Sequence, residues 1–176
     1  MKPPNMESTV DVVAQPIALS EDEARERMAH TPIERLKSLL SSREVVDGEL
    51  RYKPFYAFSV ELRKRVFRGE DIVSEGRIIV DGMTDISRPF TEESIEDETV
   101  EVASDQLIEP TVDVEEALVT AKGRRMQVEH RERGEMEMNE TPETVYKPVW
   151  VFKLANGDMR VVDAINGTVY NDLLLG

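Results

Sequence analysis

The chain has 176 residues, of which 22 are Lys or Arg and 36 are Asp or Glu, so its formal net charge is -14. This charge repels nucleic-acid phosphates and anionic lipids, which argues against nucleic acid and membranes as partners of the whole protein. The chain contains no cysteine, which excludes disulfide bonds, thiolate metal sites and thiol nucleophiles.

The first 19 residues contain three prolines and no sustained hydrophobic period, which predicts a flexible N-terminal arm. Within this arm, residues 10–13 have the apolar character of an edge strand. The sequence shows neither a signal-peptide pattern nor an apolar run of membrane-spanning length, so we expect a cytoplasmic location.

Helix signals begin at Ser20. Ser20 and Glu23 have the spacing of a capping box, and apolar residues follow at helical intervals as far as Leu40. Thr31 and Pro32 provide a second helix start, which predicts a kink or restart in an amphipathic stretch that ends near residue 42.

A β-hairpin is predicted after this helix. The Asp47-Gly48 step indicates a tight turn into a long strand over residues 51–67, and residues 77–82 are expected to form the returning strand. No basic residue occurs between Arg88 and Lys122, so residues 91–112 are interpreted as an acidic, solvated connector.

The C-terminal part repeats this order of helix and hairpin. Asp113 and Glu116 mark a helix start, but the period leaves open whether residues 123–134 continue the helix or form a strand. The polar residues 134–144 predict a loop, in which the Met136-Glu137-Met138 alternation favours a loop or an edge strand. The second hairpin comprises strands over 145–154 and 159–162 around an Asn156-Gly157 turn, followed by an Asn166-Gly167 turn.

An internal repeat is the most specific feature of the sequence. Residues 52–58 (YKPFYAF) and 146–152 (YKPVWVF) are identical at four of seven positions, and each copy precedes an aliphatic strand that ends in Asp81 or Asp163. We therefore expect an α+β fold of two related helix-plus-β-hairpin units that form an antiparallel sheet with helices on one face. The predicted single domain covers 20–176, with repeat units 20–90 and 113–176 on either side of the connector.

Two interpretations of the repeated residues are open. In the structural one, the aromatic residues pack a sheet against a helix and the aspartates hold turns. In the functional one, the two Tyr-Lys-Pro edges form an aromatic groove between the repeats that binds an extended peptide. The candidate binding residues are Tyr52, Lys53, Phe55, Tyr56, Tyr146, Lys147 and Trp150, together with the basic cluster Arg63, Lys64, Arg65 and Arg68.

Residues 162–170 (VDAINGTVY) resemble the closing signature of PepSY-like domains, in which an aliphatic strand leads through Asp and a Gly turn into a last short strand. Residues 115–118 (EEAL) are similar to the start of the helix that precedes this signature in that family. The resemblance covers about the C-terminal third and, through the repeat, extends more faintly to residues 20–86. It implies a non-catalytic interaction or inhibitory module.

The sequence favours a non-enzymatic protein- or peptide-binding module with no cofactor. No catalytic or phosphate-binding motif is present, and two histidines alone do not make a zinc site, so no metal is expected. One alternative is a carboxylate-based hydrolase in which Asp81 and Asp163 share a cleft. Another is a self-assembling structural protein in which the basic cluster docks on the acidic residues 92–116 of a neighbouring copy.

Overall fold

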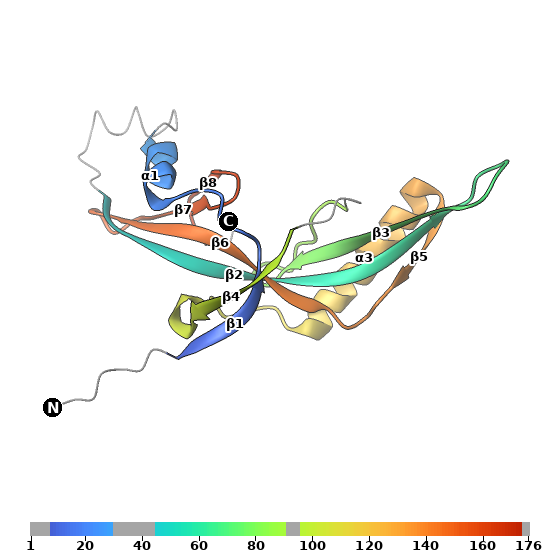
Figure 1. Ribbon diagram of the computed structural model, residues 1–176, viewed down its shortest axis with the longest axis horizontal. Coiled ribbons are helices and arrows are strands. Elements are labelled where there is room, and N and C mark those ends of the chain that lie inside the picture. The colour runs from blue at the N-terminus through green and yellow to red at the C-terminus, as the bar shows by residue number, and fades with distance from the viewer. Residues whose placement is uncertain (1–7, 30–44, 91–95, 174–176) are drawn as a thin grey trace. The chain divides into compact units, whose positions relative to one another are not determined.

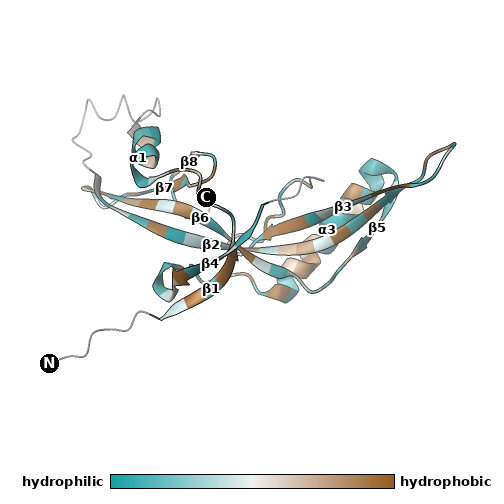
Figure 2. Cartoon of the chain, in the orientation of Figure 1, coloured by the Kyte–Doolittle hydropathy of each residue, from teal (hydrophilic) through white to brown (hydrophobic). Residues whose placement is uncertain are grey.

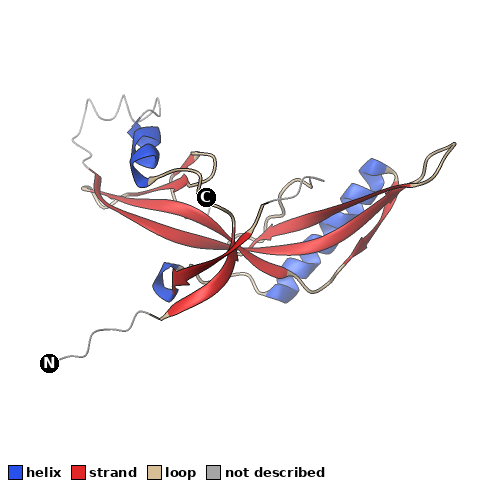
Figure 3. Ribbon diagram, in the orientation of Figure 1, coloured by secondary structure: helices blue, strands red, loops and turns tan. Residues whose placement is uncertain are grey.

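The computed structural model describes residues 8–29, 45–90 and 96–173. The strands are β1 (Thr9–Ala14), β2 (Val45–Lys64), β3 (Ile72–Asp81), β4 (Glu98–Ala103), β5 (Gly134–Met138), β6 (Glu143–Leu154), β7 (Met159–Asp163) and β8 (Val169–Tyr170), and the helices are α1 (Glu21–Ala29), the 3-10 turn η1 (Ser104–Gln106) and α3 (Val114–Glu132) (Figure 1). The strands form a mostly antiparallel sheet of order β3-β2-β6-β1-β4, with β5 beside β2, β7 beside β6 and β8 beside β7. Figure 3 distinguishes the strands from the helices by colour. The predicted α+β class is confirmed at this level.

The chain divides into two compact units. Unit 1 comprises residues 1–53, 97–108 and 146–176, and unit 2 comprises residues 54–96 and 109–145. Strands β2 and β6 run through the boundaries at Lys53–Pro54 and Val145–Tyr146, so each of them supplies residues to both units.

In unit 1, helix α1 packs on β7. Ala24 and Met28 on the helix belong to one buried cluster with Phe152 and Val162 of the hairpin β6–β7. A second cluster joins β1, β2 and β4, and Tyr52 is buried in it. Burial of these apolar side chains is the main stabilising term for such a unit.

In unit 2, helix α3 packs on β3 and β5. Alternate residues of β2 from Tyr56 to Leu62 face this helix and are buried with Ile78 and Val80 of β3. Of the intervening residues, Ser59 is exposed and Glu61 is half-buried, whereas Ala57 is buried, so the two-residue period of a strand is clearest toward the hairpin end. Figure 2 shows the resulting alternation of hydrophobic and hydrophilic residues along these strands.

Each helix packs on the hairpin that lies farther from it in the chain. The predicted repeat units join each helix to the hairpin that follows it, namely residues 20–90 and 113–176. In the structure, α1 packs on β7 of the second hairpin, whereas α3 packs on β3 of the first. Helical spacing fixes which face of a helix is apolar but carries no information about which sheet that face will cover.

One predicted turn is absent from the structure, and two open alternatives are decided. Asp47 and Gly48 lie inside β2 rather than in a turn. A Cβ atom at Gly48 would come within 2.7 Å of the Phe152 ring, so the glycine admits a close side-chain approach instead of reversing the chain. Residues 123–132, which the sequence left open between helix and strand, continue helix α3. Within the predicted loop, residues 134–138 form strand β5 beside β2, which agrees with the edge-strand alternative for residues 136–138.

The predicted N-terminal arm and acidic connector also contain regular structure. Residues 9–14 of the arm form β1, which lies between β6 and β4 in the sheet order and is therefore an interior strand. Residues 98–106 of the connector form β4 and η1. The predicted helix restart at Thr31 and Pro32 lies outside the described residues.

Candidate functional site

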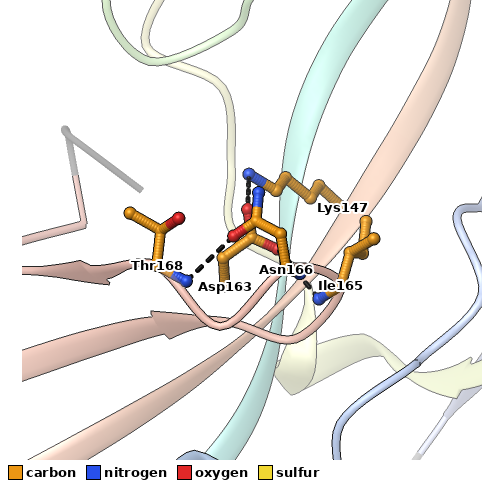
Figure 4. Close-up of polar contacts among 5 residues, drawn as sticks. All are labelled: Lys147, Asp163, Ile165, Asn166 and Thr168. Carbon is orange, nitrogen blue, oxygen red and sulfur yellow. Dashed lines mark hydrogen bonds and ion pairs between the residues drawn. The ribbon is translucent and has the colours of Figure 1, made fainter. Parts of the chain in front are cut away.

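The turn after β7 is built around a buried aspartate. Asp163 Oδ1 accepts hydrogen bonds from the backbone N–H groups of Ile165 at 2.9 Å and Asn166 at 3.3 Å. Its other oxygen, Oδ2, forms an ion pair with Lys147 Nζ at 2.5 Å (Figure 4). Both side chains are almost wholly buried. The carboxylate therefore neutralises a buried ammonium group and orders a turn, which are structural roles.

The turn after β3 has the same hydrogen bonds in unit 2. Asp81 Oδ1 accepts from Met83 N at 2.8 Å, and the N–H of Gly82 donates to Pro54 O at 3.0 Å. The counterparts in unit 1 are the bonds to Asp163 and the bond from Ala164 N to Pro148 O at 3.2 Å. Each aspartate thus holds its own turn.

Two aromatic side chains anchor the helix starts. Tyr56 Oη donates to the backbone oxygen of Val112 at 2.8 Å, and Trp150 Nε1 donates to the backbone oxygen of Leu19 at 2.9 Å. Val112 directly precedes the N-cap residue of α3, and Leu19 directly precedes Ser20, which caps α1. These donors satisfy carbonyl groups that would otherwise be left without a partner at the entry to each helix.

The remaining aromatic candidates are largely in the cores. Tyr52 and Phe55 are buried, and Tyr146 packs against the cluster that holds Tyr52. Burial, followed by the charge of Glu98, raises the pKa of Tyr52, and burial raises the pKa of Tyr146. A raised pKa keeps both phenols neutral and does not indicate reactivity.

This burial contradicts the aromatic groove expected from the sequence. The groove requires Tyr52, Phe55 and Tyr56 as walls and the two lysines at its rim, but Lys53 and Lys147 are also buried. Side chains on strands that are covered on both faces leave no surface for a peptide. The sequence could not separate these cases because aromatic residues suit a core and a binding groove equally.

The basic cluster lies at the end of the hairpin β2–β3. Lys64 Nζ contacts Glu132 at 3.0 Å and Arg65 contacts Glu135 at 3.0 Å, while Arg68 is exposed in the loop. Hydrogen bonds from Lys64 and from Arg131 lower the pKa of Glu132. Because an exposed pair contributes only about 0–1 kcal/mol, Arg65 can exchange its partner at little cost.

The sequence analysis missed the apolar residues at this hairpin end. Phe67 is 97% exposed, and Val66, Ile72 and Val73 are exposed beside it. Strand β5 begins opposite Lys64, so the loop residues 65–71 lie beyond the last pairing of the three strands. The signal in the sequence was an aromatic residue directly before Arg68-Gly69, because a turn there places the ring in solvent.

The outer edge of β3 lies next to this hairpin end. Asp81 N donates to Ile86 O at 3.0 Å and Arg88 N donates to Ile79 O at 2.9 Å, so residues 86–88 cover the C-terminal end of the edge. Backbone groups alternate in direction along a strand, so the N–H and C=O groups of Val73 and Glu75 also point outward. Among the described residues, no backbone group pairs with them.

A small hollow of about 220 Å³ lies against β5, lined by Glu61, Arg63, Glu129, Glu135, Met136 and Glu137. Its carboxylates are used by the protein itself: Glu129 accepts from Met136 N at 2.8 Å and Glu135 contacts Arg65. Within the described residues, no group of three His, Asp or Glu side chains is arranged to hold a metal ion.

Comparisons with known proteins leave the family open. No protein-family model, no curated protein and no solved structure matches this chain. In the described part of the chain, neither helix combines the length and the apolar composition needed to cross a membrane. The assignment of a function therefore depends on the geometry of the site.

Proposed function

We propose that this chain is a non-enzymatic protein-binding module that takes an extended, acidic peptide segment as an added strand on the outer edge of β3. The observation that carries the proposal is the outward backbone of Val73 and Glu75, which pairs with no described residue, on the strand that follows the loop of the exposed Phe67. In strand addition, main-chain hydrogen bonds supply affinity and neighbouring side chains supply specificity. Residues 86–88 already pair with the other end of this edge, which supports its capacity to accept a strand.

Charge and exposure support an acidic segment with apolar side chains as the ligand. Arg68 is exposed in the loop next to Phe67, and Arg65 has a side chain that is 77% exposed. A carboxylate on the added strand would gain charge-assisted hydrogen bonds from these guanidinium groups. Ile72 and Val73 would lose solvent contact against its apolar residues, which adds a favourable hydrophobic term.

We also propose that the two units descend from one duplicated helix-and-hairpin element. The four-of-seven match between residues 52–58 and 146–152 supports this relation, and so do the equivalent turns at Asp81 and Asp163. The PepSY-like signature at residues 162–170 is consistent with an element whose role is interaction. Only the copy in unit 2 carries the long charged hairpin, which would account for a binding edge there.

The test is selection of peptides from a display library on the full chain, followed by affinity measurement with two variants. Glu75→Pro removes one outward N–H, and a proline is tolerated where the N–H of an edge strand faces solvent. Glu75→Ala removes the same side chain but keeps the donor, so it is the matched control. We expect Glu75→Pro to weaken selected peptides by about fivefold or more, since one net hydrogen bond contributes about 1 kcal/mol.

Circular dichroism must show that both variants keep the native spectrum. Equal affinities of the two variants for every selected peptide would contradict the proposal, and so would a library that yields no binder. An affinity loss shared by Phe67→Ser would place the peptide at the hairpin end of the edge.

A further inference from the structure

We propose that the strand taken by β3 is the acidic strand β4 of a second copy of this chain. This inference rests on the proposed function, because it names the partner of the same edge. Strands β3 and β4 are the two ends of the strand order β3-β2-β6-β1-β4. A sheet with two open ends offers each copy one strand to give and one edge to receive.

The outer edge of β4 has free backbone groups of its own. Ser104 N donates to Ser8 O at 2.9 Å, so even-numbered residues of β4 point toward β1 and odd-numbered residues point away. The outward N–H of Ala103 is satisfied by the Gln106 side chain at 3.2 Å. Among the described residues, none pairs with the outward backbone of Thr99 and Glu101.

The basic cluster at the hairpin end is complementary in charge to β4, although Glu70, Asp71 and Glu75 lie on the same hairpin. Asp97, Glu98, Glu101 and Asp105 lie on or beside β4, within a stretch from Arg88 to Lys122 that contains no basic residue. The hairpin end has four cations within residues 63–68; the salt bridges of Arg63 and Arg65 are exposed and weak, whereas that of Lys64 is half-buried. When these surfaces meet, the cations exchange their weak ion pairs within one chain for ion pairs with carboxylates of the other chain.

The attraction between the two edges and the repulsion between whole copies depend differently on ionic strength. The net charge of -14 opposes association over long distances, whereas the complementary side chains attract at short range. At about 0.15 M salt the screening length is about 8 Å, which suppresses the long-range repulsion more than the contacts, and at about 1 M it falls to about 3 Å. We therefore expect association near 0.15 M that weakens toward 1 M.

Because β3 and β4 are different surfaces, the contact is heterologous. After one contact, one copy of the pair keeps a free β4 edge and the other keeps a free β3 edge, so growth continues head to tail. A contact of one short strand pair is small, which predicts reversible association at high protein concentration rather than a tight dimer.

Two edge-blocked variants of the full chain test this directly by sedimentation velocity. Glu75→Pro blocks β3 and Thr99→Pro blocks β4, with Glu75→Ala and Thr99→Ala as matched controls. We expect the mean mass of the wild type and of both alanine variants to rise above 20.0 kDa with concentration. Each proline variant alone should remain monomeric. An equimolar mixture of the two should form a dimer and nothing larger, because it contains one intact β3 and one intact β4.

The outcomes distinguish the partner from the site. A wild type that stays monomeric at every concentration in 0.15 M salt overturns the second copy as partner, while the peptide affinities decide the proposed function separately. If Thr99→Pro still forms a dimer and Glu75→Pro does not associate, two β3 edges pair with each other, which also overturns the role of β4. If the wild type associates but the mixture of the two proline variants stays monomeric, the role of β4 is overturned as well.

Discussion

At the scale of single residues, Lys147 and Asp163 show that a charged pair can be part of a core. Both are almost wholly buried, and the aspartate also accepts two turn N–H groups. A buried pair of this kind contributes little over an apolar pair of the same size, but each partner is needed while the other is present. The aspartate has the additional role in the turn, so the two residues are not equivalent.

We expect Lys147→Met to lower the free energy of unfolding by about 3–5 kcal/mol, because it leaves the Asp163 carboxylate buried without a counter-charge. The double variant Lys147→Met/Asp163→Asn should recover part of this loss, since the amide oxygen can still accept the turn N–H groups. Urea unfolding of the two variants measures both effects. A double variant less stable than Lys147→Met would show that the charge of Asp163, rather than its acceptor oxygen, is what the turn requires.

At the scale of elements, helix α3 contains a glycine that no close contact requires. Gly123 lies in the middle of the helix, and a Cβ atom there would meet no atom within 4 Å. We expect Gly123→Ala to stabilise the protein by about 0.5–1 kcal/mol, because alanine loses less backbone entropy in a helix. Thermal or urea unfolding measures the gain. No gain, or a loss, would mean that this part of α3 is not a regular helix in solution.

Local signals predicted the elements wherever short-range chemistry decides the structure. The capping pairs Ser20 with Glu23 and Asp113 with Glu116 stand at real helix starts, and the glycine of the Asn156-Gly157 turn has a φ of 86°. Gly48 was expected to form a turn, but a glycine is needed there because the ring of Phe152, from a distant strand, occupies the space beside it. The side chain responsible is more than a hundred positions away in the sequence, so no local window contains it.

The candidate site was predictable only in part for the same reason. Charge clustering located Arg65 and Arg68 on an exposed hairpin end, because a run of cations is solvated wherever it lies. The aromatic candidates Tyr52 and Tyr56 are buried because strands and helices distant in sequence cover them. Phe67 lies in the loop after the first strand, and it is exposed because that strand ends at Lys64 rather than at residue 67 as predicted.

At the scale of the whole molecule, the two units share the backbones of β2 and β6, which cross the unit boundaries without a linker. Unfolding one unit would therefore cut both strands, β2 near its middle and β6 three residues from its start, so we expect a single cooperative transition. The chain provides a probe for each unit: Trp150 is the one tryptophan and lies in unit 1, while most of the described helix is α3 of unit 2. Tryptophan fluorescence and circular dichroism at 222 nm should give the same urea midpoint.

The variant Leu62→Ala, which truncates the core of unit 2, tests this coupling. It should lower both midpoints together, whereas a shift in the dichroism midpoint alone would mean that the units unfold independently.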